Sequence, residues 1–276
     1  MANQALAYEA ALQFYLDHGV DGALMEEPVN HLAVAPVVSA APAAVMPHAQ
    51  PTGFSSPPQK QIQPSAAPSP VSKELATQAN SLEKLKDTLS AFDGLPVTKT
   101  ATNMVFADGH SNARVMVIGE APGADEDRQG VPFVGAGGLL LDKILACIGL
   151  DRTKDTPEEA VYLSNILNWR PPGNRTPTPI EIEACLPFIE KHIALIKPDF
   201  LILCGGLTAK SLLNSDLSLS KLRGKMHNYV PQSIDGEAPI PAIVTYHPLH
   251  LLQTPAQKKA VWQDMLRLQE QLTAKK

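Results

Sequence analysis

The sequence predicts a three-layer α/β/α domain with a central, mostly parallel sheet over residues 73–276, preceded by a disordered Pro/Ala-rich linker. From residue 114 onward, apolar runs of six or seven residues alternate with longer segments of helical periodicity. This alternation is typical of buried parallel strands that are joined by helices. Upstream, the range 31–70 contains nine prolines and a single charged residue, Lys60, a composition that indicates a linker.

Three elements are expected before the sheet. Residues 1–30 are expected to contain a short helix, because the range 5–19 places most of its apolar side chains on one helical face and Gly19 suits a helix end. Residues 31–72 are expected to be disordered, since proline interrupts helices and central strands and few large apolar groups offset the ordering entropy. The helical pattern resumes over 73–91.

The sheet and its helices follow in order. Strands are expected over 114–119, 161–167, 199–205 and 241–246, and helices over 138–148, 179–196, 206–213 and 257–272. The proline that opens the second of these helices falls in its first turn, where no backbone N–H is needed. Because ligands of open α/β sheets bind beyond the carboxyl ends of the strands, a site is expected in the segments that follow these strands.

Net charge and cysteine content narrow the function classes. The chain carries a formal charge of −5 and a pI near 5.9, which argues against a polycationic nucleic-acid coat but allows an enzyme with a local basic patch. Cys147, Cys185 and Cys204 form no CxxC pair and are expected to be buried thiols. The sequence has no leader-like N-terminus and no apolar run of about 18 residues, so a cytoplasmic protein without membrane contact is expected.

An unusual loop follows the first strand. Residues 119–138 hold six glycines, two prolines and four carboxylates, which indicates a tight turn whose backbone approaches a ligand closely. The loop matches neither GxxxxGK[ST] nor GxGxxG, and the lack of a phosphate-loop motif argues against a nucleotide-binding domain. Phe133 in this loop has two interpretations, core packing or an aromatic face for a planar ligand.

Polar residues follow the other strands. Asn165 ends its strand, and its amide is suited to reading a base edge or, alternatively, to forming an Asx turn. Arg170 and Arg175 lie on a proline-stiffened loop, where they either bind phosphates or are solvated. His247 stands where the last strand meets a helix and is either functional or structural, and Arg223 lies in a basic stretch that is a candidate for backbone contact.

The chain resembles the uracil-DNA glycosylase superfamily, and most closely its family 4 branch of iron–sulfur enzymes, in four segments: GEAPGADEDRQGVPFVGAGGLLL, SNILNWRPPGNRTP, LRGKMHNY and TYHPLHLL. The similarity runs from about residue 92 to about residue 268 and leaves residues 1–90 outside. It implies a uracil-DNA glycosylase-like domain that acts as a monofunctional DNA glycosylase. Such an enzyme flips uracil out of DNA and excises it by hydrolysis, which starts base excision repair.

The resemblance implies three central roles. Phe133 corresponds to the aromatic platform that stacks on the flipped-out uracil. Asn165 corresponds to the amide that bonds uracil N3–H and O4 and so rejects cytosine, and His247 to the histidine that donates toward O2. The chemistry needs these groups, because the glycosidic bond breaks through an oxocarbenium-like sugar while negative charge collects on the leaving base.

Relatives in family 1 carry an aspartate that activates water, and the corresponding residue in this chain is Ala121. Family 4 enzymes also lack an aspartate at this position. Glu120 and Glu126 are the candidates for positioning water or for blocking the methyl group of thymine, and Asn174 is a weaker one. Further substrate contacts are expected from Gly119, Ala121, Gly123, Asn174, Arg170, Arg175, Arg223 and Leu249. Of these, Leu249 is expected to act as, or to crowd, the wedge that fills the vacated base stack.

The iron–sulfur cluster of family 4 is not expected in this chain. The family binds a [4Fe–4S] cluster through four cysteines, and their positions correspond to Phe92, Leu95, Trp169 and Cys185. One thiolate cannot hold a cubane cluster, so we expect no cofactor and no metal, with apolar packing by the other three residues in its place. Because the family's cluster is structural, its loss need not abolish activity.

Two alternatives differ from this function. A relative that becomes covalently trapped on its product carries a basic insertion ending in histidine, for which residues 127–131 leave no room. A catalytically silent DNA-binding or tethering module is favoured by the lost cluster ligands and the long linker, and opposed by retention of Phe133, Asn165 and His247. The expected partners of this monomer are uracil-containing DNA and a protein that binds the N-terminal helix.

Overall fold

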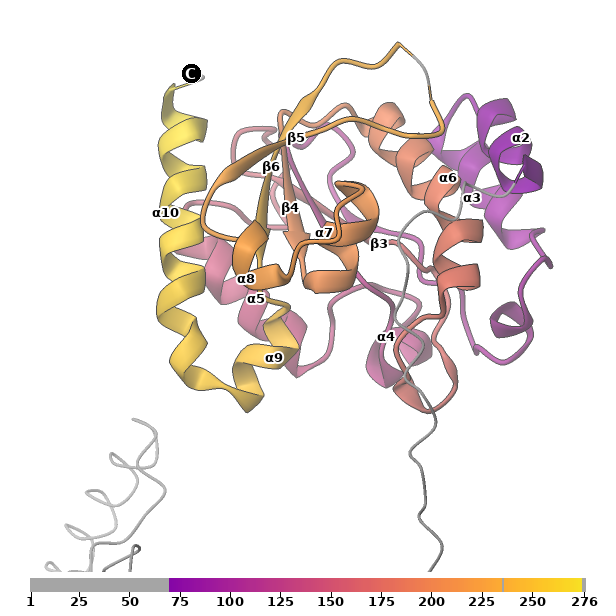
Figure 1. Cartoon of the computed structure of the whole chain (residues 1–276), viewed down its shortest axis with the longest axis horizontal. Helices are drawn as coiled ribbons and strands as arrows, with labels where there is room; N and C mark the ends of the chain where they lie inside the picture. The colour runs from indigo at the N-terminus through magenta and orange to yellow at the C-terminus, as the bar shows by residue number, and fades with distance from the viewer. Residues whose placement is uncertain (1–69, 235, 275–276) are drawn as a thin grey trace, which may run out of the picture. The chain divides into compact units, whose positions relative to one another are not determined.

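The structure is a computed structural model that describes residues 70–234 and 236–274 (Figure 1). The helix expected within residues 1–30 and all but the last three residues of the expected linker lie outside these ranges. Those three residues open helix α2 (Pro70–Gln78). The helix therefore begins three residues earlier than expected, with its proline in the first turn, where a missing N–H is tolerated.

One six-stranded sheet forms the centre of the described residues, with the strand order β1-β3-β2-β4-β6-β5. Its strands are β1 (Asp108–Gly109), β2 (Val115–Gly119), β3 (Val161–Asn165), β4 (Phe200–Cys204), β5 (Met226–Tyr229) and β6 (Ile240–Thr245). The central four run parallel, and β1 and β5 pair antiparallel at the two edges. The expected mostly parallel sheet is confirmed, and the two edge strands are additions that the sequence did not predict.

The remaining α-helices of the described residues are α3 (Leu82–Ser90), α4 (Ala124–Gln129), α5 (Ala136–Ala146), α6 (Pro179–Ile196), α7 (Gly206–Leu212), α8 (Leu219–Leu222), α9 (Pro248–Gln253) and α10 (Lys258–Ala274). Helices α5, α6, α7 and α10 confirm the four expected after the first strand. The helical pattern expected over 73–91 takes the form of two helices, α2 and α3, because Ser81 accepts a hydrogen bond from Lys84 N–H (3.1 Å) and so caps a new helix. None of the helices in the described part of the chain is both long and apolar enough to span a membrane.

Helices cover both faces of the sheet (Figure 1). Met116 and Ile118 of β2 belong to the core on the side of α2, α3, α6 and α7, whereas Val115 and Val117 belong to the core on the side of α5 and α10. Every residue of β2, β3 and β4 is buried, as expected for parallel strands covered on both sides. The result is the expected α/β/α layering.

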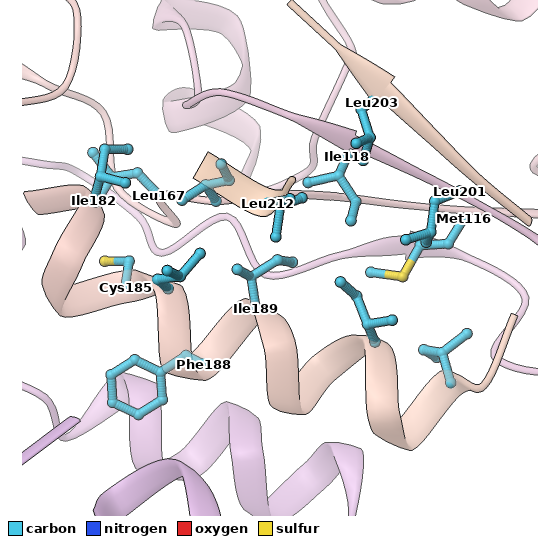
Figure 2. Packing of buried hydrophobic residues seen from close by; sticks show 14 of the residues in the cluster. Met116, Ile118, Leu167, Ile182, Cys185, Phe188, Ile189, Leu201, Leu203 and Leu212 are labelled. Carbon is cyan, nitrogen blue, oxygen red and sulfur yellow. The ribbon is translucent and has the colours of Figure 1, made fainter. Parts of the chain in front are cut away.

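Helix α6 forms much of the core on the side of α2, α3 and α7. Figure 2 shows Ile189 pointing toward strand residues such as Ile118 and Leu201, while Phe188 points away from the sheet. Cys185 and Cys204 are buried, as expected. The expectation for Cys147 was wrong: it is exposed, because it caps the C-terminal end of α5 at the surface.

The parallel register brings the carboxyl ends of four strands to one edge of the sheet. Gly119 at the end of β2 pairs with Asn165 at the end of β3. At the next two strands in the sheet, the N–H of Gly205, directly after β4, donates to the carbonyl of Thr245 at the end of β6 (2.9 Å). The loops that follow these strands therefore converge.

Replacing Ile189 by alanine is expected to lower the free energy of unfolding by about 2–5 kcal/mol, because the variant leaves a cavity between α6 and the sheet. Ile189 is 3% exposed. Urea unfolding measures the change. Ile180→Ala, in the same helix but 72% exposed, is the matched control and should change the stability by about 0.5 kcal/mol or less; equal losses in the two variants would contradict the packing described.

Candidate active site

A cavity of about 420 Å³ opens at the carboxyl edge of the sheet. It is lined by the segments that follow β2, β3 and β6. Of the thirteen site residues expected from the sequence, ten line it: Glu120, Ala121, Gly123, Glu126, Phe133, Asn165, Asn174, Arg175, His247 and Leu249. Gly119, Arg170 and Arg223 lie outside the lining. The structure thus brings together most residues that the sequence places on three separate loops.

Gly119 makes room for two of these side chains. A Cβ at this position would lie 2.3 Å from Asn165 Oδ1 and 2.6 Å from Phe133 Cζ. Both distances are far shorter than van der Waals contact, so a larger residue at the end of β2 would displace the amide or the ring. Gly119 therefore contributes to the cavity by lacking a side chain.

Phe133 is buried and has an unusual backbone conformation. Its φ is +54°, in the left-handed region that bulky residues rarely occupy. Its ring lies nearly parallel to the imidazole of His247, with an interplanar angle of 24° and 5.9 Å between centroids. Both rings line the cavity, so a flat ligand there meets an aromatic face.

The amide of Asn165 is buried at the end of β3, with 3% of the residue exposed. Among the described residues, no hydrogen-bond partner is found for this amide, whereas the neighbouring Asn168 donates to the carbonyl of Val105 (2.9 Å). The Asx turn that the sequence left open does not form at Asn165 in the described chain. Its two donors and its acceptor are therefore available to a ligand in the cavity.

The two candidate carboxylates have different surroundings. Glu126 accepts hydrogen bonds from three backbone N–H groups: Gly123 (3.1 Å), Val134 (3.1 Å) and Gly135 (2.9 Å). It thereby closes the first turn of α4 and ties that helix to the segment after Phe133. The oxygens of Glu126 are consequently occupied by the protein backbone.

Glu120, by contrast, makes no side-chain hydrogen bond among the described residues. Partial burial raises the pKa of its carboxyl above the ordinary 4.5. A Cβ placed on Gly205 would lie 3.7 Å from Glu120 Oε2 and 3.6 Å from His247 Cβ. The Glu120 carboxylate and His247 therefore approach the same strand end.

His247 is held in one tautomer. Its Nδ1 accepts a hydrogen bond from Leu249 N–H (3.3 Å), and burial lowers its pKa from 6.5 to about 4, with the nearby Glu126 carboxylate opposing the shift. The ring is therefore neutral near pH 7. Because Nδ1 is the acceptor, the single ring proton lies on Nε2.

The three arginines expected at the site differ in their environment. Arg175 lines the cavity and forms a two-pronged ion pair with Glu181 (2.7 and 2.8 Å), which lowers the pKa of Glu181 to about 2. Arg170 donates to Oδ1 of Asn174 (2.6 Å), a residue that lines the cavity. Both guanidinium groups are thus fixed near the rim.

Arg223 is turned toward α10. Its Nη2 donates to both carboxylate oxygens of the fully buried Asp264 (3.0 Å each) and to the carbonyl of Ala260 (2.7 Å). The guanidinium also lies over the ring of Tyr246, 5.3 Å from its centroid. These contacts support the segment before His247, and the expected contact of Arg223 with DNA stays a prediction.

The residues at the family's cluster positions do not fit an iron–sulfur cluster. Phe92, Leu95, Trp169 and Cys185 are all buried in one apolar cluster. The Phe92 ring lies 6.3 Å from Trp169 and 5.2 Å from Phe188. Burial raises the pKa of the single thiol, Cys185, and the described residues contain no group of three or more His, Cys, Asp or Glu side chains that could hold a metal ion.

Sequence reasoning missed several residues at the site. Ala136, Gly137, Gly138, Pro171, Thr176 and Pro177 also line the cavity. The glycine pair at 137–138 was a visible signal, because the missing side chains allow Leu249 to approach Gly137 and the carbonyl of Phe133 to approach Gly138. Arg152, which lies behind the first loop and bonds its backbone, gave no signal, since its partners are distant in the sequence.

Comparison with known proteins agrees with this geometry. The family model of the uracil DNA glycosylase superfamily matches residues 106–266. A type-4 uracil-DNA glycosylase of Pyrobaculum aerophilum is 35% identical over 67% of this chain and 91% of its own length. Those of Archaeoglobus fulgidus and Sulfurisphaera tokodaii are 37% and 34% identical, over 62% and 69% of this chain and 83% and 84% of their own lengths. The resemblance expected from the four motifs is confirmed, and the chain belongs to the uracil DNA glycosylase superfamily.

Proposed function

We propose that this uracil-DNA glycosylase flips uracil out of DNA into the cavity and hydrolyses its N-glycosidic bond, as the first step of base excision repair. The observation that carries the proposal is the convergence of three groups on one cavity: the ring of Phe133, the amide of Asn165 and the Nε2–H of His247. A base inside the duplex cannot enter such a cavity, so flipping has to precede excision.

Selection of uracil is assigned to Phe133 and Asn165. The aromatic face of Phe133 stacks on any pyrimidine. The amide of Asn165 accepts from N3–H with its oxygen and donates to O4 with its nitrogen. Cytosine presents an acceptor at N3 and a donor at N4, so both hydrogen bonds fail.

His247 is assigned to the leaving base. Negative charge collects on uracil as the bond to the sugar breaks, and a donor aimed at O2 stabilises that charge. Because the pKa of His247 is lowered to about 4, the neutral ring makes this hydrogen bond at physiological pH. Its orientation is fixed by the bond from Leu249 N–H to Nδ1.

Positioning of the attacking water is assigned to Glu120. The carboxylate of Glu126 is already engaged by three backbone N–H groups, so its part is to hold the loop that carries Phe133. Glu120 lines the cavity and has no such partner in the described chain. A free carboxylate beside the sugar can accept a hydrogen bond from water and stabilise positive charge on the sugar ring.

DNA contacts are assigned to the rim of the cavity. Arg170 and Arg175 lie fixed at its edge, where phosphates of the substrate strand would pass. Leu249 is 52% exposed, and its backbone lies against Gly137, where a Cβ would be 3.1 Å from Leu249 N. An exposed apolar side chain held rigidly at the mouth suits a wedge that fills the space left by the flipped base.

Excision from an oligonucleotide with a single uracil tests the function, with the uracil in single-stranded DNA or opposite guanine or adenine. We expect release of uracil and no release of thymine or cytosine. DNA binding without excision of any base would overturn the proposal and support a silent DNA-binding module instead.

In the same assay, Asn165→Asp is expected to slow uracil excision by about 10- to 100-fold and to reduce the preference for uracil over cytosine, because a carboxylate cannot donate to O4. Asn112→Asp, at an exposed position before β2, is the matched control and should behave as the wild type. Unchanged selectivity of Asn165→Asp would refute the role given to this amide.

The pH profile of kcat tests Glu120. Its pKa is raised above 4.5 by burial. As the pH decreases and the carboxyl is protonated, kcat should therefore fall, and the midpoint of this acid limb should lie above pH 4.5. Glu120→Gln should lower kcat by about 10²- to 10⁴-fold and abolish this limb. His247 titrates lower, near pH 4. Exposed Glu158→Gln serves as the control; persistence of the limb in Glu120→Gln would show that another group causes it.

We also propose that the chain binds no iron–sulfur cluster, because the apolar side chains of Phe92, Leu95 and Trp169 occupy three of the four ligand positions. Protein purified under anaerobic conditions should contain neither iron nor acid-labile sulfide in stoichiometric amount and should show no absorbance near 400 nm. Cys185→Ala should excise uracil at the wild-type rate. One equivalent of a four-iron cluster, lost on this substitution, would disprove the proposal.

A further inference from the structure

Arg152 is a partly buried residue behind the first loop that makes several polar contacts, with 11% of its side chain exposed. Its Nε donates to Asp142 Oδ1 (2.9 Å), and Nη2 approaches the same oxygen (2.7 Å). Nη1 donates to Asp108 Oδ2 and to the carbonyl of Pro132 (3.0 Å each), and Nη2 donates to the carbonyl of Phe133 (2.9 Å). Four of these contacts are hydrogen bonds, and together the contacts engage all three nitrogens of the guanidinium group.

We propose that Arg152 is a positioning residue for uracil excision, which keeps the ring of Phe133 in the cavity by clamping the backbone carbonyls of Pro132 and Phe133. The inference rests on the proposed function, in which Phe133 stacks on the flipped base. Arg152 itself does not line the cavity, so it acts only through the loop that it holds.

The conformation of Phe133 is what needs holding. Its φ of +54° is unfavourable for a residue with a Cβ and a large ring. Without bonds to its backbone, the residue would relax toward the extended region and turn the ring out of the cavity. The carbonyl of Phe133 is also close to α5, since a Cβ on Gly138 would lie 1.8 Å from this oxygen. Glycine permits the approach, and Arg152 stabilises it.

The loop is held from two sides by opposite charges. Arg152 donates to its carbonyls, while Glu126 accepts from the N–H groups of Val134 and Gly135. Arg152 is in turn fixed by Asp108 on β1 and Asp142 on α5. The clamp therefore joins the strained residue to an edge strand and a helix.

Geometry explains why arginine stands at this position. Two carbonyls and two carboxylates surround the group from different directions, and a planar fork reaches all of them at once. A lysine ammonium has the same charge but is a single point with three donors, so it cannot satisfy both carbonyls and both carboxylates. Arg152→Lys thus removes the clamp while keeping the charge.

A double-mutant cycle of Arg152→Lys with Phe133→Ala tests the proposal, using single-turnover excision by the full chain at saturating enzyme, well below the unfolding temperature. We expect Arg152→Lys to lower the rate by about 10- to 100-fold with unchanged affinity for DNA. In the Phe133→Ala background the same substitution should have no further effect, because the ring that it positions is gone. Arg114→Lys, which alters a partly buried arginine paired with Asp199 (2.6 Å), is the control and should not slow excision.

If Arg152→Lys does not fold, Asp108→Asn removes one anchor of the clamp and takes its place in the cycle, with a smaller expected loss. A merely structural role would lower the unfolding temperature and leave the two effects multiplicative. Multiplicative effects, with Phe133→Ala slow on its own, overturn the positioning role alone. A wild-type rate for Phe133→Ala overturns the stacking role in the proposed function and the positioning role with it.

Discussion

Parallel pairing of β2 with β3 and β4 is the constraint on which the site depends. It places the ends of these strands side by side, and the loops that follow β2 and β3 line one cavity together with the segment that follows β6. Gly119 and Asn165 are paired partners in this register, and a slip by one residue would turn the amide to the opposite face of the sheet. The absence of a side chain on Gly119 then decides how closely Asn165 and Phe133 can approach.

The first loop shows how irregular backbone is stabilised beside a cavity. Buried N–H and C=O groups need partners, and this loop lacks the regular bonds of a helix or strand. Glu126 supplies acceptors for the N–H groups and Arg152 supplies donors for the carbonyls. Two charged residues thereby hold the backbone of the loop that carries the aromatic ring from opposite sides.

Sequence patterns predicted what depends on local periodicity. The four parallel strands are apolar runs, and helix 179–196 carries a proline in its first turn, so these elements were expected correctly. Strand β1 has only two residues, and β5 is the short mixed run MHNY, with His227 and Asn228 between Met226 and Tyr229, so neither is a continuous apolar run. Glu120 and Glu126 are indistinguishable in sequence because only the folded loop decides which carboxylate meets backbone N–H groups.

The apolar cluster at Phe92, Leu95, Trp169 and Cys185 joins three segments that are distant in sequence. In the family that the chain resembles, a cluster with four thiolates ties corresponding segments together. Here the same connection is made by the packing of aromatic rings. These rings come from the segment after α3, the start of the loop after β3 and helix α6. Because Trp169 directly precedes Arg170, this packing anchors the loop whose arginines lie at the cavity rim. Such an anchor requires neither iron nor a reducing environment, since it depends only on removing apolar surface from water.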